Sequence, residues 1–67
     1  MTYKIRLGGT ADEFVSAMPL TPFGEVKFVE GWTNPDALVW KTKEEVKNAQ
    51  NMVWEIEGFH TTIEEMK

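Results

Sequence analysis

The side chains that could carry out acid–base or metal chemistry are one histidine and the carboxylates near it in the chain. His60 is the only histidine, and general acid–base work or zinc binding would need Glu57, Glu64 or Glu65 beside it. Glu57 and His60 have the spacing of one helix face, but Gly58 between them disfavours a continuous helix. One histidine with two carboxylates is also a poor zinc site. We therefore expect an ordinary surface or partly buried histidine, no metal and no cofactor.

Nucleophilic catalysis and phosphate binding find little support among the other residues. Ser16 is the only serine and lacks the surrounding glycines of a nucleophile elbow, and the chain contains no cysteine. The glycines form neither a G-x-G-x-x-G motif nor a glycine-lysine-threonine run. From these patterns we expect that the chain is not an enzyme.

Two carboxylates and one tryptophan are the candidate partner-binding residues. Glu55 and Glu57 would share one face of a strand, where they could meet a basic partner, although a solvated outer sheet face is the plainer interpretation. Trp32 lies just before a turn and is expected to be partly exposed, and an exposed aromatic residue at a strand end can anchor a protein partner. Core packing is the competing interpretation for Trp32.

Size and charge limit the classes of partner. With 67 residues the chain is expected to form a single domain over residues 1–67. Seven Lys and Arg against eleven Asp and Glu give a net charge of -4, which repels a phosphate backbone, so we expect no direct nucleic-acid binding. No apolar run approaches the roughly 20 residues of a membrane span or forms a signal peptide, so we expect no membrane association. The absence of cysteine favours a cytoplasmic location.

Alternation of apolar and polar residues predicts the first strands. It favours strands at 3–7 and 25–32, the second with Val26 and Phe28 facing the core. Gly8 and Gly9 should end the first strand in a turn. Residues 10–18 fit either a short helix opened by a Thr10–Glu13 capping box or a strand near 13–18, and the β-forming side chains and following prolines favour the strand. Residues 19–22 would then connect a hairpin.

The second half of the chain holds the strongest local signal for a helix. A turn is expected at 33–36, followed by an extended run at Val39 and Trp40. Thr42 and Glu45 then form a capping box, which predicts a helix from Lys43 to about Asn51. The buried stripe of that helix would consist of Val46, Ala49 and Val53.

Residues 52–57 are expected to form a further strand, with Trp54 and Ile56 in the core. Trp40 and Leu38 are also expected in the core. Gly58 then marks a bulge or a turn, and residues 61–67 could be a strand or a final helical turn. The predicted fold class is α+β, with a small antiparallel sheet of three to four strands and one helix, about 43–51, packed on one face.

Residues 26–56 combine a short strand, an alanine followed by an aromatic residue, and a capped helix. The residues concerned are Val26-Lys27-Phe28, Trp32-Thr33, Asp36-Ala37-Leu38-Val39-Trp40, Thr42-Lys43-Glu44-Glu45-Val46 and Ala49. This combination resembles small uncharacterised proteins encoded in phages and prophages of Gram-positive bacteria. The resemblance implies that Ala37 and Trp40 anchor the helix on a β-rich sheet and that a strand rich in acids follows. Its residues are structural, and it implies no known activity.

Because no convincing active site is found, the sequence favours a small non-enzymatic protein–protein interaction module, such as an accessory protein of a phage or prophage. Its partner would be another protein or a second copy, since an unpaired strand such as 3–7 or 52–57 could join its copy in a homodimer. The alternative is an acidic surface that imitates nucleic acid or inhibits a basic nucleic-acid-binding protein.

Overall fold

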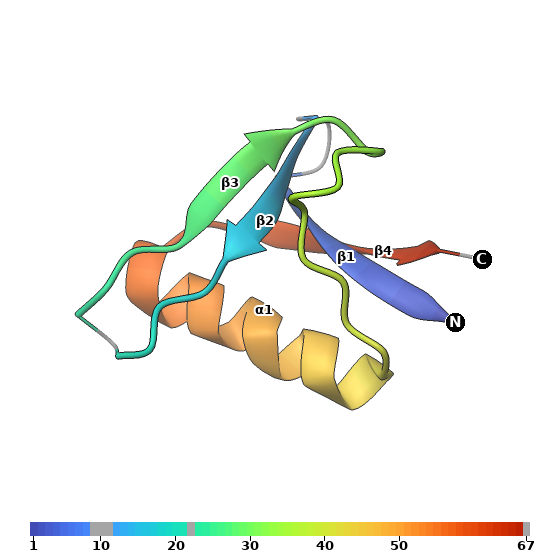
Figure 1. Ribbon diagram of the computed structural model, residues 1–67. Coiled ribbons are helices and arrows are strands. Elements are labelled where there is room, and N and C mark those ends of the chain that lie inside the picture. Colours follow the sequence, from blue (N-terminus) through green and yellow to red (C-terminus); the bar gives the residue numbers. More distant parts are fainter. Residues whose placement is uncertain (9–11, 22, 67) are drawn as a thin grey trace.

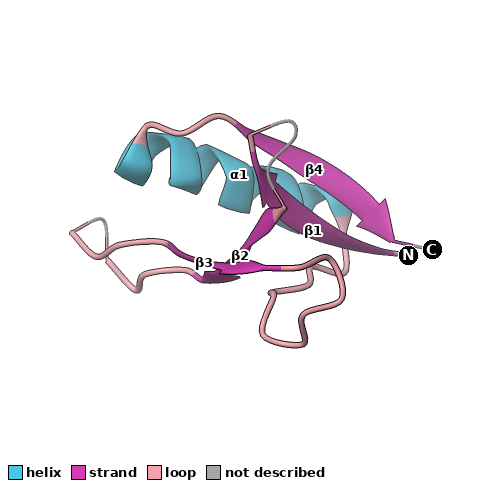
Figure 2. Ribbon diagram, turned by 90° about the horizontal axis from the view of Figure 1, so that it is seen from above, coloured by secondary structure: helices cyan, strands magenta, loops and turns pink. Residues whose placement is uncertain are grey.

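A computed structural model describes residues 1–8, 12–21 and 23–66, and in it a four-stranded sheet carries one helix. The elements are β1 (Thr2–Leu7), β2 (Glu13–Ala17), β3 (Lys27–Glu30), α1 (Lys43–Glu57) and β4 (Thr61–Met66). The strand order is β3-β2-β1-β4, every neighbouring pair is antiparallel, and α1 covers one face, as Figure 1 and Figure 2 show. The predicted α+β fold, a small antiparallel sheet with one packed helix, is confirmed.

The main core lies between the sheet and the buried stripe of α1. Ile5 of β1 and Val15 of β2 are fully buried and cluster with Val46 and Val53 of the helix. Burial of each side chain of this size contributes roughly 1.5–3 kcal/mol, so a few such contacts decide whether so short a chain folds. The other buried members of the cluster are Tyr3, Val26 and Ala49. Partly buried around it are Met18, Phe28, Leu38, Trp40, Ile56 and Ile63.

The start of α1 forms as its sequence predicts. Thr42 has an extended backbone, and its side chain accepts a hydrogen bond from the backbone N–H of Glu45 at 3.1 Å. This bond satisfies one of the N–H groups that have no partner in the first helical turn. Glu44 and Glu45 place negative charge at the same end, where the helix dipole favours it.

The end of α1 corrects the prediction, because the strand expected at 52–57 is helical. The stripe of Val46, Ala49 and Val53 continues to Ile56 at the same spacing of three and four residues, so these residues keep one face of the helix on the core. Gly58 then ends the helix in the left-handed conformation, with φ of 72°, and donates its N–H to the Trp54 carbonyl.

The core role expected for Trp54 is therefore wrong. Its side chain lies off the buried stripe of α1 and is 51% exposed. Ile56, Leu38 and Trp40 do pack against the core from its periphery, as expected. Ala37 is buried as well, next to the peripheral residue Leu38.

A segment before α1 lies between β1 and β2, where these two strands diverge in Figure 1. The expected turn is present: Asn34 and Ala37 donate their backbone N–H groups to the carbonyls of Gly31 and Asn34. The chain then runs between the two strands. Leu38 donates its N–H to the Val15 carbonyl of β2, and Trp40 exchanges two backbone bonds with Tyr3 of β1, at 2.8 and 2.9 Å. These bonds satisfy backbone groups that the divergence would leave unpaired.

The edge strands of the sheet are β3 and β4. The two segments expected as unpaired strands, 3–7 and 52–57, are not at an edge. β1 is interior, with β4 on one side and β2 on the other, and residues 52–57 belong to α1. The strands predicted at 13–18 and 25–32 are β2 and the shorter β3, and residues 18–26 connect them as a hairpin. Of the two alternatives for the last residues, a strand or a helical turn, the structure shows the strand β4. The positions predicted at Gly9, Thr10, Pro22 and Lys67 lie outside the described residues.

Candidate functional site

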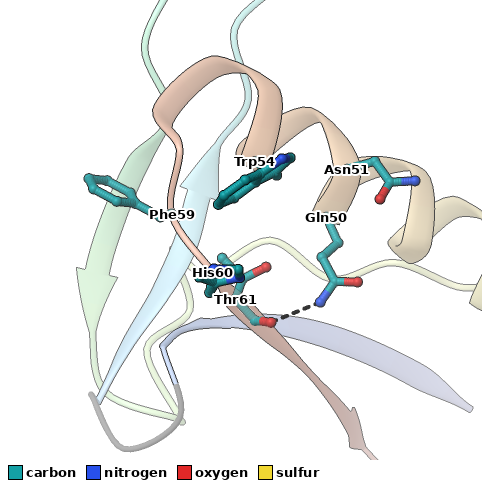
Figure 3. A pocket seen from close by; sticks show the side chains of 6 residues that line it. All are labelled: Gln50, Asn51, Trp54, Phe59, His60 and Thr61. Carbon is teal, nitrogen blue, oxygen red and sulfur yellow. Dashed lines mark hydrogen bonds between the residues drawn. The ribbon is translucent and has the colours of Figure 1, made fainter.

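A hollow of about 280 Å³ opens at the corner where α1 ends and β4 begins. Figure 3 shows its lining residues, which come from the last turns of the helix, the connection at 58–60 and the first residue of β4. We call it the Trp54 hollow, and its lining residues are Gln50, Asn51, Trp54, Phe59, His60 and Thr61.

Aromatic rings form one wall of the Trp54 hollow. The Trp54 and His60 rings lie 4.6 Å apart between centroids and are inclined by 31°, which is a tilted stack. This contact exists because Gly58 reverses the chain at the end of α1 and brings His60 back over the helix. Phe59 is 44% exposed and contacts Phe28 of β3, with ring centroids 6.2 Å apart. The wall therefore keeps much of its aromatic surface open to solvent.

The floor of the Trp54 hollow is polar. The Gln50 side-chain amide donates a hydrogen bond to the Thr61 carbonyl at 2.8 Å, drawn as a dashed line in Figure 3. The Thr61 hydroxyl is buried and has no hydrogen-bond partner in the described part of the chain. A buried polar atom without a partner costs stability.

The Trp54 hollow combines exposed aromatic rings with polar groups. Of the three carboxylates expected as possible partners of His60, Glu57 accepts from the Val26 N–H and Glu64 pairs with Arg6, while Glu65 lies further along β4. Within residues 1–8, 12–21 and 23–66 no group of three or more His, Asp or Glu side chains is arranged to hold a metal ion. An exposed aromatic wall above a polar floor fits an apolar or aromatic side chain together with a peptide group.

Trp32, predicted as a partly exposed anchor, packs on the sheet face opposite α1. Its ring contacts Phe14, with centroids 5.3 Å apart, and the Lys4 ammonium lies 5.0 Å from its centroid. Lys4 also donates to the Trp32 carbonyl, and the Arg6 guanidinium lies 4.9 Å from the Phe14 centroid. We call Lys4, Arg6, Phe14 and Trp32 the Lys4–Trp32 cluster. Trp32 keeps part of its surface exposed there and stays a predicted contact residue.

The two predicted carboxylates do not share a strand face, because both lie in the last turns of α1. Glu57 accepts a hydrogen bond from the Val26 N–H at 3.1 Å, which joins the helix end to the start of β3. Glu55 is exposed and lines a second, smaller hollow of about 150 Å³ beside Leu20, Met52 and Ile56. Of this pair, Glu55 alone has a carboxylate with no partner among the described residues.

The sequence prediction missed the Trp54 hollow, although the chain contains a signal for it. Gly58 follows a stripe of helical spacing and so reads as a helix C-cap, which would have placed Trp54 on the flank of a longer helix. A large ring on that flank, followed by Phe59 and His60 after a tight reversal, predicts an exposed aromatic corner.

No described helix is both long and apolar enough to cross a membrane. Comparisons with protein-family models, with curated proteins and with solved structures found no match for this chain.

Proposed function

We propose that this chain is a small, non-enzymatic protein-binding module of the cytoplasm and that the Trp54 hollow holds its partner. The proposal is carried by the exposure of Trp54, whose ring is half accessible in a chain with few residues to build a core. A protein partner that covers this ring would gain the burial that the fold leaves unused.

The geometry around Trp54 supports this role. Its stack on His60 fixes the orientation of the ring before binding, which reduces the entropy that a partner must overcome. The Gln50 side-chain amide in the polar floor adds a group that can discriminate among ligands. A protein partner and a second copy of the chain, as a homodimer, are both consistent with this function. The resemblance of residues 26–56 to phage and prophage proteins supports an accessory role in phage biology.

The test is affinity capture from a nuclease-treated bacterial lysate, followed by mass spectrometry, with wild-type protein and matched variants. We expect Trp54→Ala to lose the captured partner and Phe23→Ala to retain it, because Phe23 is 97% exposed but lies far along the chain in the β2–β3 connection. Trp32→Ala tests the anchor predicted from sequence. Capture that Trp54→Ala leaves unchanged contradicts the proposal. If high salt also releases that partner, the acidic nucleic-acid mimic is favoured instead.

A further inference from the structure

The outer edge of β4 presents backbone groups in a fixed alternation. On β1, Tyr3 directs its N–H and carbonyl toward Trp40, whereas Gly8 donates its N–H to the His60 carbonyl on the β4 side. In an antiparallel ladder the direction alternates from residue to residue. Thr62, Glu64 and Met66, which pair with Arg6, Lys4 and Thr2, therefore bond to β1. The residues between them direct their backbone groups outward, and these are Thr61, Ile63 and Glu65.

One of these outward groups is already occupied. The Gln50 side chain donates to the Thr61 carbonyl at 2.8 Å, so α1 closes the edge at the first residue of β4. The outward N–H and carbonyl of Ile63 and of Glu65 have no partner within the described residues. The open part of the edge is thus a short ladder centred on Ile63 and Glu65, and unpaired edges of this kind accept an added strand.

A second copy of β4 fits this edge badly in every antiparallel register. Pairing Ile63 with its own copy places Thr61 opposite Glu65, where Gln50 competes with the added strand for the Thr61 carbonyl. A shift by two residues toward the start of β4 again uses the Thr61 carbonyl. A shift toward its end places Glu64 opposite Glu64 or Glu65 opposite Glu65. Like charges directly opposite each other destabilise a strand pair.

The charge of the edge identifies a better occupant. β4 carries Glu64 and Glu65 and no basic residue, in a chain whose net charge is -4. Glu64 is neutralised by Arg6 at 2.9 Å, while Glu65 is exposed with no ion pair among the described residues. A Lys or Arg opposite Glu65 would supply the missing positive charge.

We infer that β4 binds an extended, basic segment of a partner protein by strand addition, with the segment hydrogen-bonded to Ile63 and Glu65. This inference rests on the proposed protein-binding function and specifies how the partner is held. The segment stops at Thr61 because Gln50 holds that carbonyl, and its next side chain enters the Trp54 hollow, which Thr61 also lines. Backbone bonds supply affinity along β4, and the hollow supplies selectivity at its end.

The test begins with selection of a displayed library of random linear peptides on the wild-type protein. The selected peptides, made synthetically, are then mapped by amide hydrogen exchange. In the free protein the amides of Thr62 and Glu64 should exchange slowly and those of Ile63 and Glu65 rapidly. With peptide at about 100 times Kd, exchange at Ile63 and Glu65 should slow by up to about a hundredfold. The selected sequences should carry Lys or Arg at the position opposite Glu65 and no proline in the paired stretch.

Two substitutions at one position separate charge from backbone bonding. Glu65→Ala removes the carboxylate and keeps the outward N–H, so affinity should fall about two- to fivefold. Glu65→Pro also removes the N–H and should weaken binding by about a further tenfold. The fold should tolerate proline there, because this N–H faces away from β1, and the retained slow exchange of Glu64 checks that it does.

Each other outcome overturns the inference. Peptides that bind while Ile63 and Glu65 still exchange rapidly would keep the proposed function and remove strand addition. Failure to select any peptide, with lysate capture still dependent on Trp54, would have the same meaning. A dimer that Glu65→Pro converts to monomer in sedimentation would assign the edge to a second copy. Loss of both peptide binding and Trp54-dependent capture would end the proposed function as well.

Discussion

The carboxylate of Glu57, at the last residue of α1, accepts a hydrogen bond from the backbone N–H of Val26 at 3.1 Å. Val26 is buried directly before β3, so its N–H has little access to water. A charged acceptor on this group is stronger than a neutral one, and it connects the end of the helix to an edge strand of the sheet.

Removal of this acceptor should destabilise the fold. Glu57→Ala leaves the Val26 N–H without a partner and should lower the free energy of unfolding by about 1–2 kcal/mol. Glu57→Gln keeps an acceptor oxygen and should cost less. Urea denaturation measures both. Glu55→Ala is the matched control two residues earlier, because Glu55 is exposed and unengaged, and equal losses at the two positions would contradict the role of Glu57.

Thr61→Val should stabilise the protein by about 1 kcal/mol. The Thr61 hydroxyl is buried without a hydrogen-bond partner, and valine has the same shape without the polar atom. Thr62→Val is the control, since the Thr62 hydroxyl donates to the Gly8 carbonyl at 2.7 Å and its removal should give no gain. Thermal unfolding of both variants measures the difference. Stabilisation by Thr62→Val alone would refute the assignment.

Gly58→Ala should destabilise the protein by about 1 kcal/mol, through backbone conformation only. Gly58 has φ of 72°, and a methyl group added there would meet no atom within 4 Å. Gly58→Asn should cost less than Gly58→Ala, because asparagine adopts the left-handed conformation more easily. If the two variants unfold at the same denaturant concentration, the cost does not arise from this dihedral angle.

Lys4→Met should destabilise the Lys4–Trp32 cluster by about 1–3 kcal/mol. Lys4 is only 5% exposed, and its ammonium group donates to the Trp32 carbonyl and lies over the Trp32 ring. Methionine keeps the apolar stem and removes the charge, so the carbonyl loses its donor. Lys27→Met, at an exposed position of β3, is the control for loss of charge alone. Equal stability of the two variants in chemical denaturation would exclude the cluster as a source of stability.

The fold was predictable from sequence where one pattern dominated its neighbourhood. Alternation identified the strand that contains Tyr3 and Ile5, and the Thr42–Glu45 capping box identified the helix start. Residues 52–57 satisfy two patterns at once, because Trp54 and Ile56 alternate as in a strand while Val53 and Ile56 continue a helical stripe. Gly58 as a helix C-cap favours the second pattern, and packing of the stripe on the sheet agrees with it.

The candidate site was less predictable because it depends on contacts between separate elements. Trp54 was expected in the core on account of its size, but the helix that replaced the predicted strand rotates it toward solvent. The bond from Gln50 to Thr61 exists only once α1 lies against β4, and no spacing in the sequence signals it. The partner-binding role of Trp32 stays a prediction.

The pairing of Thr2 with Met66 governs the order in which the protein can fold. β1 is an interior strand, yet β4, its partner along its whole length, is the last element of the described chain. Closing this pair brings together residues 2 and 66, and so long a loop costs more chain entropy than the local β2–β3 hairpin. During synthesis the hairpin and α1 can form before β4 leaves the ribosome, whereas β1 still lacks its β4 partner at that stage. The sheet is therefore completed only after the hairpin and α1 have been synthesised.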